Sequence, residues 1–421
     1  MKINLLALVI FAFQISFANA QISDSTATTK TPKDSLQIKK TQPESMKLYF
    51  SPLPVIGSNP AFGFIYGLAA SGSMYLGAPA NTKMSNALVT ATYSTKNQLM
   101  FTLKSNVYTS NNKWFLLGDW RLFFSSQPTF GLGTGPQSEI LYTEEGFELG
   151  DYKNGVEEGE LMEFNLIRFH ETFMREIKPS FYVGVGYHLD VYSEINDQLL
   201  DLDSNSLKLT NHFSYSQLHG FNPEKYTMSG VSANVIYDSR DNVANPYEGQ
   251  FAFISFKSIP EFLGSDQDAT SLWLEYKTYI GLSQKTPRHL IALWSYYSSV
   301  TSGNVPYMGL PSLGWDQMGR SGRAYPQGRF RGDDLFYAEA EYRVPLPIFG
   351  KNKDLLGAVV FANMTSASAE DLDVDIFKYI KPGAGVGLRV MIQKQSRANL
   401  TIDYAVGEDG GAFYLNLNET F

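Results

Sequence analysis

FYVGVGYHLDV, residues 181–191, alternates from end to end between apolar side chains and polar or small ones. One face carries Phe181, Val183, Val185, Tyr187, Leu189 and Val191, and the other carries Tyr182, Gly184, Gly186, His188 and Asp190. A strand with one face in lipid and the other in a polar lumen has this period of two. Its length suits the roughly 9 to 11 residues with which a tilted strand crosses a bilayer. The stretch therefore predicts a transmembrane β-strand.

The same alternation recurs at residues 99–107, 336–344 and 398–406. The polar faces of the last two stretches carry Tyr337, Glu339, Glu341, Arg343, Asn399, Thr401 and Asp403. A soluble β-sandwich also alternates, with a core on one face and water on the other. Aromatic residues near the expected strand ends favour the membrane, because they suit the girdles at its two interfaces. These residues are Trp114, Tyr276, Trp294, Tyr296 and Tyr404.

Composition narrows the class of protein further. The 421 residues include no cysteine, which excludes disulfides, thiolate metal sites and thiol nucleophiles. The formal net charge of −8 argues against a nucleic-acid partner, since neutralising phosphates requires a basic face. Aromatic residues make up 14% of the chain, yet the mean hydropathy is only −0.18. Because only helices and closed barrels satisfy their backbone in lipid, a membrane protein of this composition is expected to be a barrel.

The chain divides into three expected segments. Residues 1–20 carry one lysine, a short apolar run and the A-x-A site Ala18-Asn19-Ala20, which predicts a signal peptide cleaved after Ala20. Residues 21–45 are rich in Ser, Thr, Lys and Pro and are expected to form a disordered periplasmic tether. Residues 46–421 consist throughout of short alternating stretches separated by polar or Gly/Pro/Asn-containing connections, and they are expected to form the barrel.

Fifteen strands can be counted in residues 46–421, and bacterial barrels have even numbers. We therefore expect an all-β, antiparallel transmembrane barrel of sixteen strands, with the missing strand near 46–55 or within 126–159. Short connections at 174–179, 239–250, 284–288 and 393–397 alternate with longer ones at 193–225, 259–270, 300–334 and 365–381. That alternation matches short periplasmic turns and long extracellular loops.

One short connection has a marked pattern, Asp238-Ser-Arg240-Asp241-Asn242, followed by Pro246 and Gly249. Asp and Asn tolerate turn geometry, and an arginine can tie carboxylates together, so a tight periplasmic hairpin is expected. A turn with no further role is the simpler interpretation of the pattern, and it is favoured. A second pattern is GRAYPQGRFRGD, residues 322–333, followed by the strand that carries Glu339 and Glu341. A third is the pair of stretches 382–389 and 413–421, PGAGVGLR and FYLNLNETF.

Together these stretches resemble the BamA/TamA superfamily, also called the bacterial surface antigen family, over roughly the last 200 residues. The resemblance implies that the loop at about 300–333 folds into the lumen, with Arg323 and Tyr325 at its tip. It also implies that Arg323 pairs with a lumen carboxylate at the position of Glu341, with Glu339, Arg329 and Arg331 as secondary partners. Phe421 would be the aromatic end that the outer-membrane assembly machinery reads as an address, and the register of Phe413 and Leu415 places it on the lipid face.

Three departures from the family pattern matter. The loop glycine is Ala324, which adds a Cβ where an unusual backbone angle is often needed. The strand motif that usually carries an aspartate has Asn363, so the expected ion pair of Arg323 rests on Glu341. No POTRA repeat is recognised before the barrel, whereas most relatives that assemble or secrete proteins carry one or more.

No pattern for enzyme chemistry is present. The five histidines have no zinc-binding spacing, and no nucleophile elbow or phosphate-binding loop occurs. The acidic run 370–375 lacks the glycine and the final glutamate of a calcium loop, and a solvated extracellular loop is the simpler interpretation. We therefore expect no catalytic residue, no metal and no cofactor.

The leading functional hypothesis is an outer-membrane barrel of a Gram-negative bacterium that helps to insert, assemble or export other envelope proteins. Its expected partners are outer-membrane lipid, the assembly machinery and an envelope protein complex. A passive porin-like channel and a structural scaffold for surface partners are the alternatives.

Overall fold

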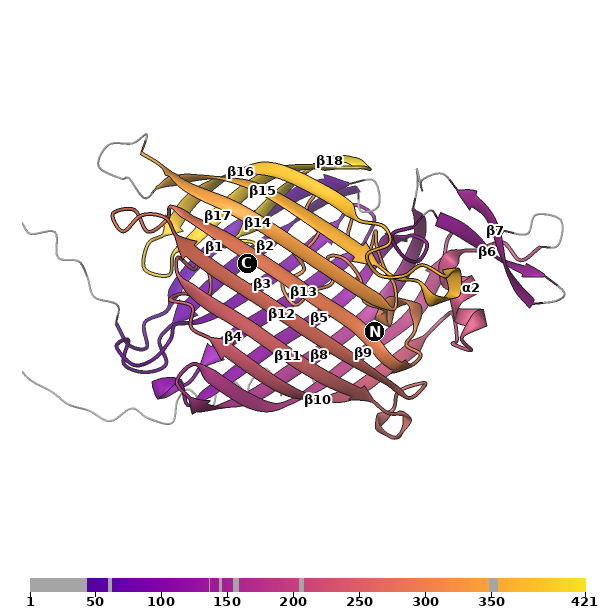
Figure 1. The fold of residues 1–421 in the computed structure, drawn as a ribbon, viewed down its shortest axis with the longest axis horizontal. Helices are drawn as coiled ribbons and strands as arrows, with labels where there is room; N and C mark the ends of the chain where they lie inside the picture. The colour runs from indigo at the N-terminus through magenta and orange to yellow at the C-terminus, as the bar shows by residue number, and fades with distance from the viewer. Residues whose placement is uncertain are drawn as a thin grey trace, which may run out of the picture. The chain divides into compact units, whose positions relative to one another are not determined.

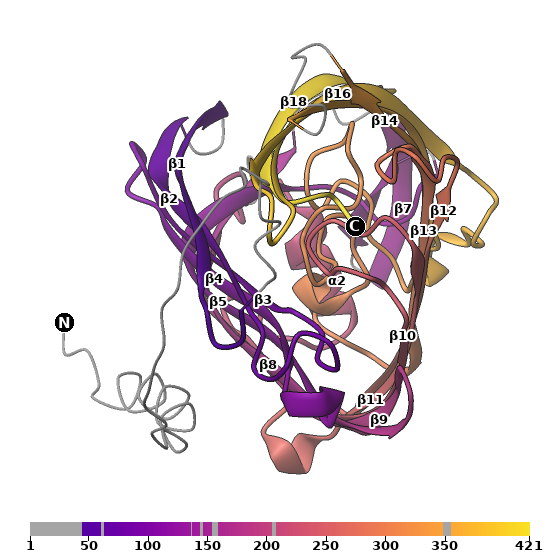
Figure 2. The same ribbon diagram turned by 90° about the vertical axis from the view of Figure 1, so that its left-hand side faces the viewer.

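The computed structural model describes residues 44–59, 63–135, 137–143, 146–153, 159–203, 208–347 and 355–421. The expected signal peptide lies outside the described residues, as does the expected tether up to residue 43. Sixteen antiparallel strands form one sheet in sequence order, which is a nearly closed barrel (Figures 1 and 2). The predicted fold class and strand number are confirmed.

The barrel strands are β1 Tyr49–Asn59, β2 Gly63–Met74, β3 Ser85–Ser94, β4 Leu99–Tyr108, β5 Trp114–Thr129, β8 Glu160–Lys178, β9 Phe181–Asp197, β10 Tyr226–Asp238, β11 Gly249–Ile259, β12 Ala269–Gly281, β13 Leu290–Gly303, β14 Asp334–Leu346, β15 Leu356–Ala367, β16 Lys381–Gln393, β17 Ala398–Gly407 and β18 Gly410–Leu417. The strand missed in the count is β1. A separate two-stranded sheet pairs β6 Gln137–Thr143 with β7 Gly146–Lys153. The one α-helix of the described part is α2 Asn211–Leu218, and short 3-10 turns occur at Ser110–Asn112, Glu261–Leu263, Tyr307–Gly309 and Glu370–Leu372.

The alternation places side chains as expected in most strands. On β9, Val185 is 65% exposed on the outside, whereas Tyr182 and Asp190 are buried in the lumen. Gly184 is required by the approach of β8, since a Cβ there would lie 1.9 Å from the main-chain oxygen of Phe173. Among the described residues no helix has both the length and the apolar character to span a bilayer.

Two aromatic residues expected in the interfacial girdles are instead inside the barrel. Trp294 and Tyr296 are both 2% exposed, and they belong to a lumen cluster with Tyr337 and Phe421. Even-numbered residues of β13 point inward, so the prediction for these two was wrong because it rested on residue type and ignored the face of the strand. Trp114, Tyr276 and Tyr404 are exposed as expected.

The four longest connections, which join β5 to β8, β9 to β10, β13 to β14 and β15 to β16, lie at one end of the barrel, called here the loop end, and the opposite end is called the turn end. The connection between β13 and β14, residues 304–333, folds into the interior, where Figure 2 shows it inside the ring of strands. Its apolar side chains Tyr307, Met308, Leu313 and Phe330 are buried. We call residues 304–333 the inward loop, and its position confirms the expectation.

Candidate functional site

Arg323, on the inward loop, is surrounded by three carboxylates of the barrel wall. It donates to Glu339 on β14, with 2.6 Å between Nη2 and Oε1, and to Asp403 on β17, with 2.8 Å between Nη1 and Oδ2. Nη2 also donates to Oε1 of Glu341. Burial by itself lowers the pKa of Arg323, but the three carboxylates outweigh it and hold the pKa well above its ordinary value. Four hydrogen bonds from the charged guanidinium of Arg323, two to Glu339 and one each to Glu341 and Asp403, therefore hold the loop at this point.

Further charges extend this group into what we call the anchor cluster. It consists of three arginines and four carboxylates, all at most 5% exposed: Arg323, Arg343, Arg389, Glu339, Glu341, Asp403 and Glu419. Arg343 pairs with Glu341 at 2.6 Å and Arg389 pairs with Glu419 at 2.7 Å. Buried ions are tolerated when they are paired and hydrogen-bonded, and removing one partner leaves a charge uncompensated. The cluster thus joins the inward loop, β14, β16, β17 and the residues after β18.

The predicted partner Glu341 does lie at Arg323, and so does Glu339, but Asp403 was not foreseen. Asp403 fits because β16 has a glycine opposite it: a Cβ at Gly387 would lie 1.8 Å from Oδ1 of Asp403. Asn363 has a neutral side chain and therefore makes no ion pair with Arg323. Its Nδ2 donates to the main-chain oxygen of Arg323 at 2.9 Å, so the amide holds the loop backbone instead of the guanidinium.

The backbone of the loop tip has an uncommon conformation. Gly322 has φ +80° and Ala324 has φ +105°, a region that glycine adopts readily and alanine does not. Tyr325 is buried, and its hydroxyl donates to the main-chain oxygen of Pro382 at 2.5 Å. Its ring lies against Gly407, where a Cβ would approach it to 2.8 Å. The tip therefore packs against β16 and β17.

The other two arginines of the loop motif have partners outside the anchor cluster. Arg329 pairs with Asp409 in the connection between β17 and β18, with 2.6 Å between Nε and Oδ2. Arg331 donates to the main-chain oxygen of Tyr307 at 2.7 Å and lies over the Tyr307 ring. The structure does not bring either of them to Glu339 or Glu341.

The inward loop has a second attachment on the opposite wall. Arg121 of β5 and Arg168 of β8 each lie 5.4 Å from the ring centre of Trp315. Arg121 also donates to the main-chain oxygen of Asp316 at 3.2 Å. Residues 304–333 are thus tied to both sides of the barrel, and neither composition nor motif spacing pointed to Trp315.

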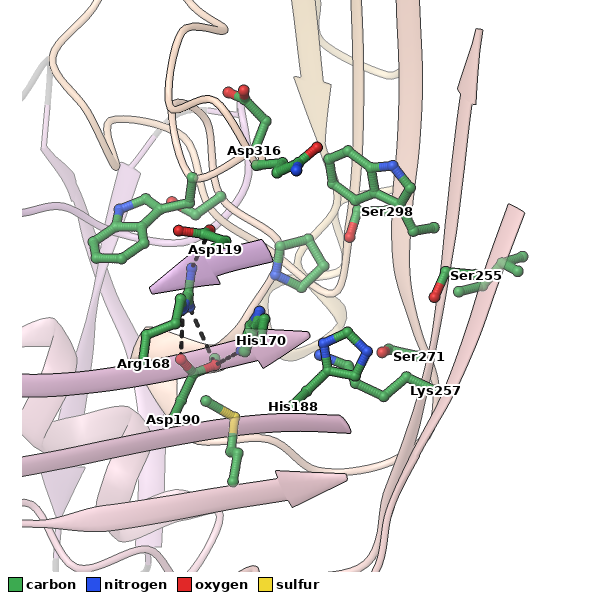
Figure 3. A pocket seen from close by; sticks show the side chains of 18 of the residues that line it. Asp119, Arg168, His170, His188, Asp190, Ser255, Lys257, Ser271, Ser298 and Asp316 are labelled. Carbon is green, nitrogen blue, oxygen red and sulfur yellow. Dashed lines mark hydrogen bonds and ion pairs between the residues drawn. The ribbon is translucent and has the colours of Figure 1, made fainter. Parts of the chain in front are cut away.

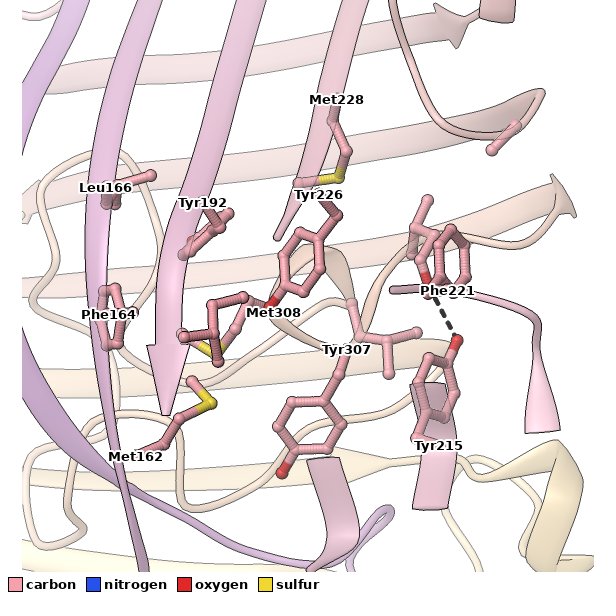
Figure 4. Packing of buried hydrophobic residues seen from close by; sticks show 14 of the residues in the cluster. Met162, Phe164, Leu166, Tyr192, Tyr215, Phe221, Tyr226, Met228, Tyr307 and Met308 are labelled. Carbon is pink, nitrogen blue, oxygen red and sulfur yellow. Dashed lines mark hydrogen bonds between the residues drawn. The ribbon is translucent and has the colours of Figure 1, made fainter. Parts of the chain in front are cut away.

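Between the loop and the wall lies a cavity of about 220 Å³ (Figure 3). Its charged lining includes a pair in which Arg168 lies 2.5 Å from Asp190, and His170 lies 3.0 Å from the same carboxylate. No group of three or more His, Asp or Glu side chains suited to a metal ion occurs in the described part of the chain. Towards the loop end, an apolar cluster covers the interior, where Tyr215 of α2 donates to the main-chain oxygen of Val305 at 2.9 Å (Figure 4).

Residues 418–421 leave β18 and turn into the lumen, where Figure 2 shows the chain end. Phe421 is 5% exposed, and its ring centre lies 5.2 Å from that of Trp294. Arg343 donates to the main-chain oxygen of Phe421 at 3.1 Å. Arg320 of the inward loop donates to the main-chain oxygens of Leu417 and Glu419. The expected lipid-facing register of Phe421 was therefore wrong, because the strand ends at Leu417 and its alternation does not continue.

The turn after β10 does more than reverse the chain. Arg240 donates to Asp238 through Nε and Nη2, at 3.0 and 2.9 Å, and Lys83 from the connection between β2 and β3 lies 3.4 Å from the same carboxylate. Asp241 pairs with Arg397 in the turn between β16 and β17. The side chain of Asn242 accepts from the backbone N–H groups of residues 244 and 245, at 2.8 and 2.9 Å. The turn therefore contacts the connection between β2 and β3 and the turn between β16 and β17, both at the turn end of the barrel.

The first and last strands of the sheet are its two free edges. Within the described residues, β1 and β18 share no ladder of backbone hydrogen bonds. A contact near the turn end joins the two sides, since Nδ2 of Asn418 donates to Oγ of Ser71 on β2 at 3.2 Å. We call the line between β1 and β18 the seam. A sixteen-stranded barrel with a filled lumen and an unpaired seam defines a particular class of outer-membrane protein.

The Omp85 superfamily domain matches residues 81–421, and the chain belongs to the Omp85 superfamily. Members of this superfamily lie in the outer membrane of Gram-negative bacteria and work within outer-membrane assembly or secretion systems. No curated protein matches the chain by sequence.

Solved structures with a similar fold include BamA from Haemophilus ducreyi lacking POTRA domains 1–3. It has a TM-score of 0.54 and 14% identity, over 98% of this chain and 77% of that one. CdiB from Escherichia coli has a TM-score of 0.50 and 10% identity, over 89% and 63% of the two chains. CdiB from Acinetobacter baumannii has a TM-score of 0.48 and 12% identity, over 88% and 59%. The chain thus spans less than two thirds of either CdiB, and at these identities the likeness concerns the fold.

Proposed function

We propose that this barrel helps to insert, assemble or export other envelope proteins in the outer membrane, in an accessory role within a complex. The observation that carries the proposal is the combination of an unpaired seam with a filled lumen. Unpaired backbone groups in lipid are unfavourable, so a seam is expected where a passing or folding chain can supply partners. The protein is proposed to lose residues 1–20 by cleavage and then to be inserted into the outer membrane by the assembly machinery. It is also proposed to have no enzyme activity.

The alternative function is a porin-like channel, and the filled lumen argues against it. The anchor cluster, the inward loop and residues 418–421 occupy the interior, and their charges are paired with one another instead of lining an open path. A porin gives large, steady conductance in planar bilayers. The plugged barrel proposed here is expected to give small or erratic openings.

The test is complementation after depletion of the chromosomal copy in the source bacterium. Wild type is expected to restore the levels of other outer-membrane proteins, and Arg323→Ala or Glu341→Ala is expected to insert normally but to restore them less. The matched control is Arg329→Ala, which removes a loop arginine outside the anchor cluster. If depletion leaves every other envelope protein at its normal level, the proposal is wrong. A scaffold would then be indicated by a partner that copurifies from native membranes.

A further inference from the structure

The cavity between the inward loop and the wall contains a lysine that has no anionic partner. On β11, Ile254 and Phe256 are exposed on the outside of the barrel, so Lys257 points into the lumen. It lines the cavity, where Figure 3 shows it next to His188. Among the described residues, Lys257 forms neither a hydrogen bond nor an ion pair.

The carboxylates that line the same cavity already have partners. Asp190 accepts from Arg168 through both of its oxygens, at 2.5 and 3.2 Å, and it also lies 3.0 Å from His170. Glu275 lies 2.9 Å from Nζ of Lys277. The other two acidic residues of the lining are held by an arginine and by backbone N–H groups, respectively: Asp119 and Asp316. A cation held away from bulk water is stabilised by an opposite charge, and here the protein supplies none to Lys257.

The inward loop presents hydrogen-bond donors to the other side of the cavity. Oγ of Ser312, Nε1 of Trp315 and Nε2 of Gln317 are buried, and in the described part of the chain they have no hydrogen-bond partner. All three residues line the cavity that Lys257 lines. Buried donors are nearly always paired, because an unpaired one loses its bond to water without replacement. The cavity is therefore complementary to a molecule with a negative charge and several acceptor oxygens.

The size and the remaining lining of the cavity favour an organic molecule over a single ion. Its volume is about 220 Å³, whereas one water molecule occupies about 30 Å³ in the liquid. Part of the lining is apolar and includes Trp273, Val300 and Met308. Ligand sites commonly combine apolar walls with a few polar groups that fix the orientation of the ligand.

We propose that this cavity binds a small organic anion, whose charged group pairs with Lys257 and whose other oxygens accept hydrogen bonds from the three donors of the inward loop. A phosphate and a carboxylate share this chemistry. The bound anion connects β11 to the inward loop, so it stabilises the loop in its position inside the barrel. The proposal concerns a ligand site, and it does not depend on the role of the barrel in protein assembly.

Binding is measured by isothermal titration calorimetry on the full-length protein in detergent. The probes are glucose 6-phosphate and gluconate, and glucose is the neutral control with the same number of carbon atoms. We expect at least one of the two anions to bind about tenfold more tightly than glucose, because only an anion pairs with Lys257. The anion that binds more tightly assigns the charged group as a phosphate or a carboxylate.

Variants on both sides of the cavity locate the site. Lys257→Met should weaken binding of the anion about tenfold, and Lys257→Arg, which keeps the charge, should restore most of the affinity. The matched control is Lys178→Met, which removes an exposed lysine at the end of β8 outside the cavity. Gln317→Leu removes a donor of the inward loop and should weaken binding several-fold without a change in charge.

A second measurement asks whether the ligand holds the loop. Saturating anion should slow protease cleavage within residues 304–333 in the wild type and in Lys178→Met, but not in Lys257→Met. Folding of each variant is checked by heat-modifiable mobility on gels, and Lys257→Gln replaces Lys257→Met if the latter does not fold. Gln317→Leu provides an independent test from the loop side.

The proposal is overturned if neither anion binds more tightly than glucose. It is also overturned if Lys257→Met and Lys178→Met weaken binding equally, since the anion would then associate with the protein without a defined site. Slower cleavage in every variant would show that the anion does not act through Lys257. None of these measurements involves another envelope protein, so the proposed function stands or falls separately by complementation.

Discussion

Nη1 of Arg323 lies 2.8 Å from Oδ2 of Asp403, a residue 80 positions later in the chain on a strand that is not adjacent to β14. Asp403 also accepts from Arg389, whose Nε donates to Glu419 at 2.7 Å. The inward loop and the residues after β18 are therefore connected through one carboxylate. A substitution at Arg323 should therefore also alter the contacts of the residues after β18, because Arg323 and Arg389 share Asp403 as a partner.

Replacing Arg323 with alanine should lower the free energy of unfolding by about 3 to 5 kcal/mol, because it leaves Glu339, Glu341 and Asp403 buried with less compensation. Denaturant unfolding in detergent or vesicles measures the loss. Arg329→Ala, whose partner Asp409 is 32% exposed, should cost about 1 kcal/mol. Equal losses for the two variants would contradict a special role of the anchor cluster.

Asp403→Asn keeps the size of the side chain and removes its charge, so it should loosen both Arg323 and Arg389. We expect a loss of about 2 kcal/mol, typical of weakening a buried charged hydrogen bond. We also expect faster protease cleavage within residues 304–333 and more frequent openings in planar bilayers. Asp409→Asn is the matched control. Unchanged cleavage in Asp403→Asn would show that the loop is held without this carboxylate.

Ala324→Gly should stabilise the barrel, because Ala324 has φ +105°, where a Cβ is unfavourable. The expected gain is about 1 kcal/mol in the free energy of unfolding. Ala340→Gly, on the lipid face of β14 in ordinary strand conformation, should have the opposite effect of about 0.5 to 1 kcal/mol. A loss of stability in Ala324→Gly would mean that the methyl group makes a contact that outweighs the strain.

Asp238→Ala should destabilise the turn end, because the variant leaves Arg240, Lys83 and the hydroxyl of Tyr108 without their shared acceptor. The expected loss is about 3 to 5 kcal/mol, measured by denaturant unfolding. Asp241→Ala removes a more exposed pair with Arg397 and should cost about 1 kcal/mol or less. If the two aspartates prove equivalent, the connection is a simple turn.

The variant Phe421→Ala tests whether Phe421 contributes to packing of the folded barrel or to sorting to the outer membrane. Phe421 is buried against Trp294, so its truncation should cost about 3 kcal/mol in unfolding and should slow refolding into vesicles without any cellular machinery. Phe413→Ala, at a side chain that is 79% exposed, should have little effect in the same assay. A variant Phe421→Ala that refolds normally in vesicles but is absent from the outer membrane in cells would assign the residue to sorting alone.

Local patterns predicted most of the wall of this barrel. Alternation in β9, β14 and β17 identified which side chains point into the lumen, because the strand period of two holds wherever one face meets lipid and the other does not. It failed at Trp294 and Tyr296, where residue type was weighed instead of position, and at Phe421, where the strand had already ended. β1, the strand that the sequence count missed, was hard to recognise because Pro52 and Pro54 interrupt the sequence pattern of a strand.

The interior was predicted in outline only. The motif around Arg323 led to Glu341, since both belong to one recognisable stretch of sequence. Trp315, Asp403 and Arg320 carry no local signal, because each is a single residue whose partners come from distant strands or from residues 417–419. The spacing of residues along the chain does not predict contacts of this kind.

The sequence by itself determined that this protein is a membrane barrel and, for most strands, which face meets lipid, because those properties depend on neighbours in the chain and on the solvent. Only the tertiary structure decided what fills the lumen, which charges compensate one another and which edges stay unpaired. The reason is physical: the energies of buried ions and of unpaired backbone groups depend on distances across the barrel, and those exist only after the sheet has curved around on itself.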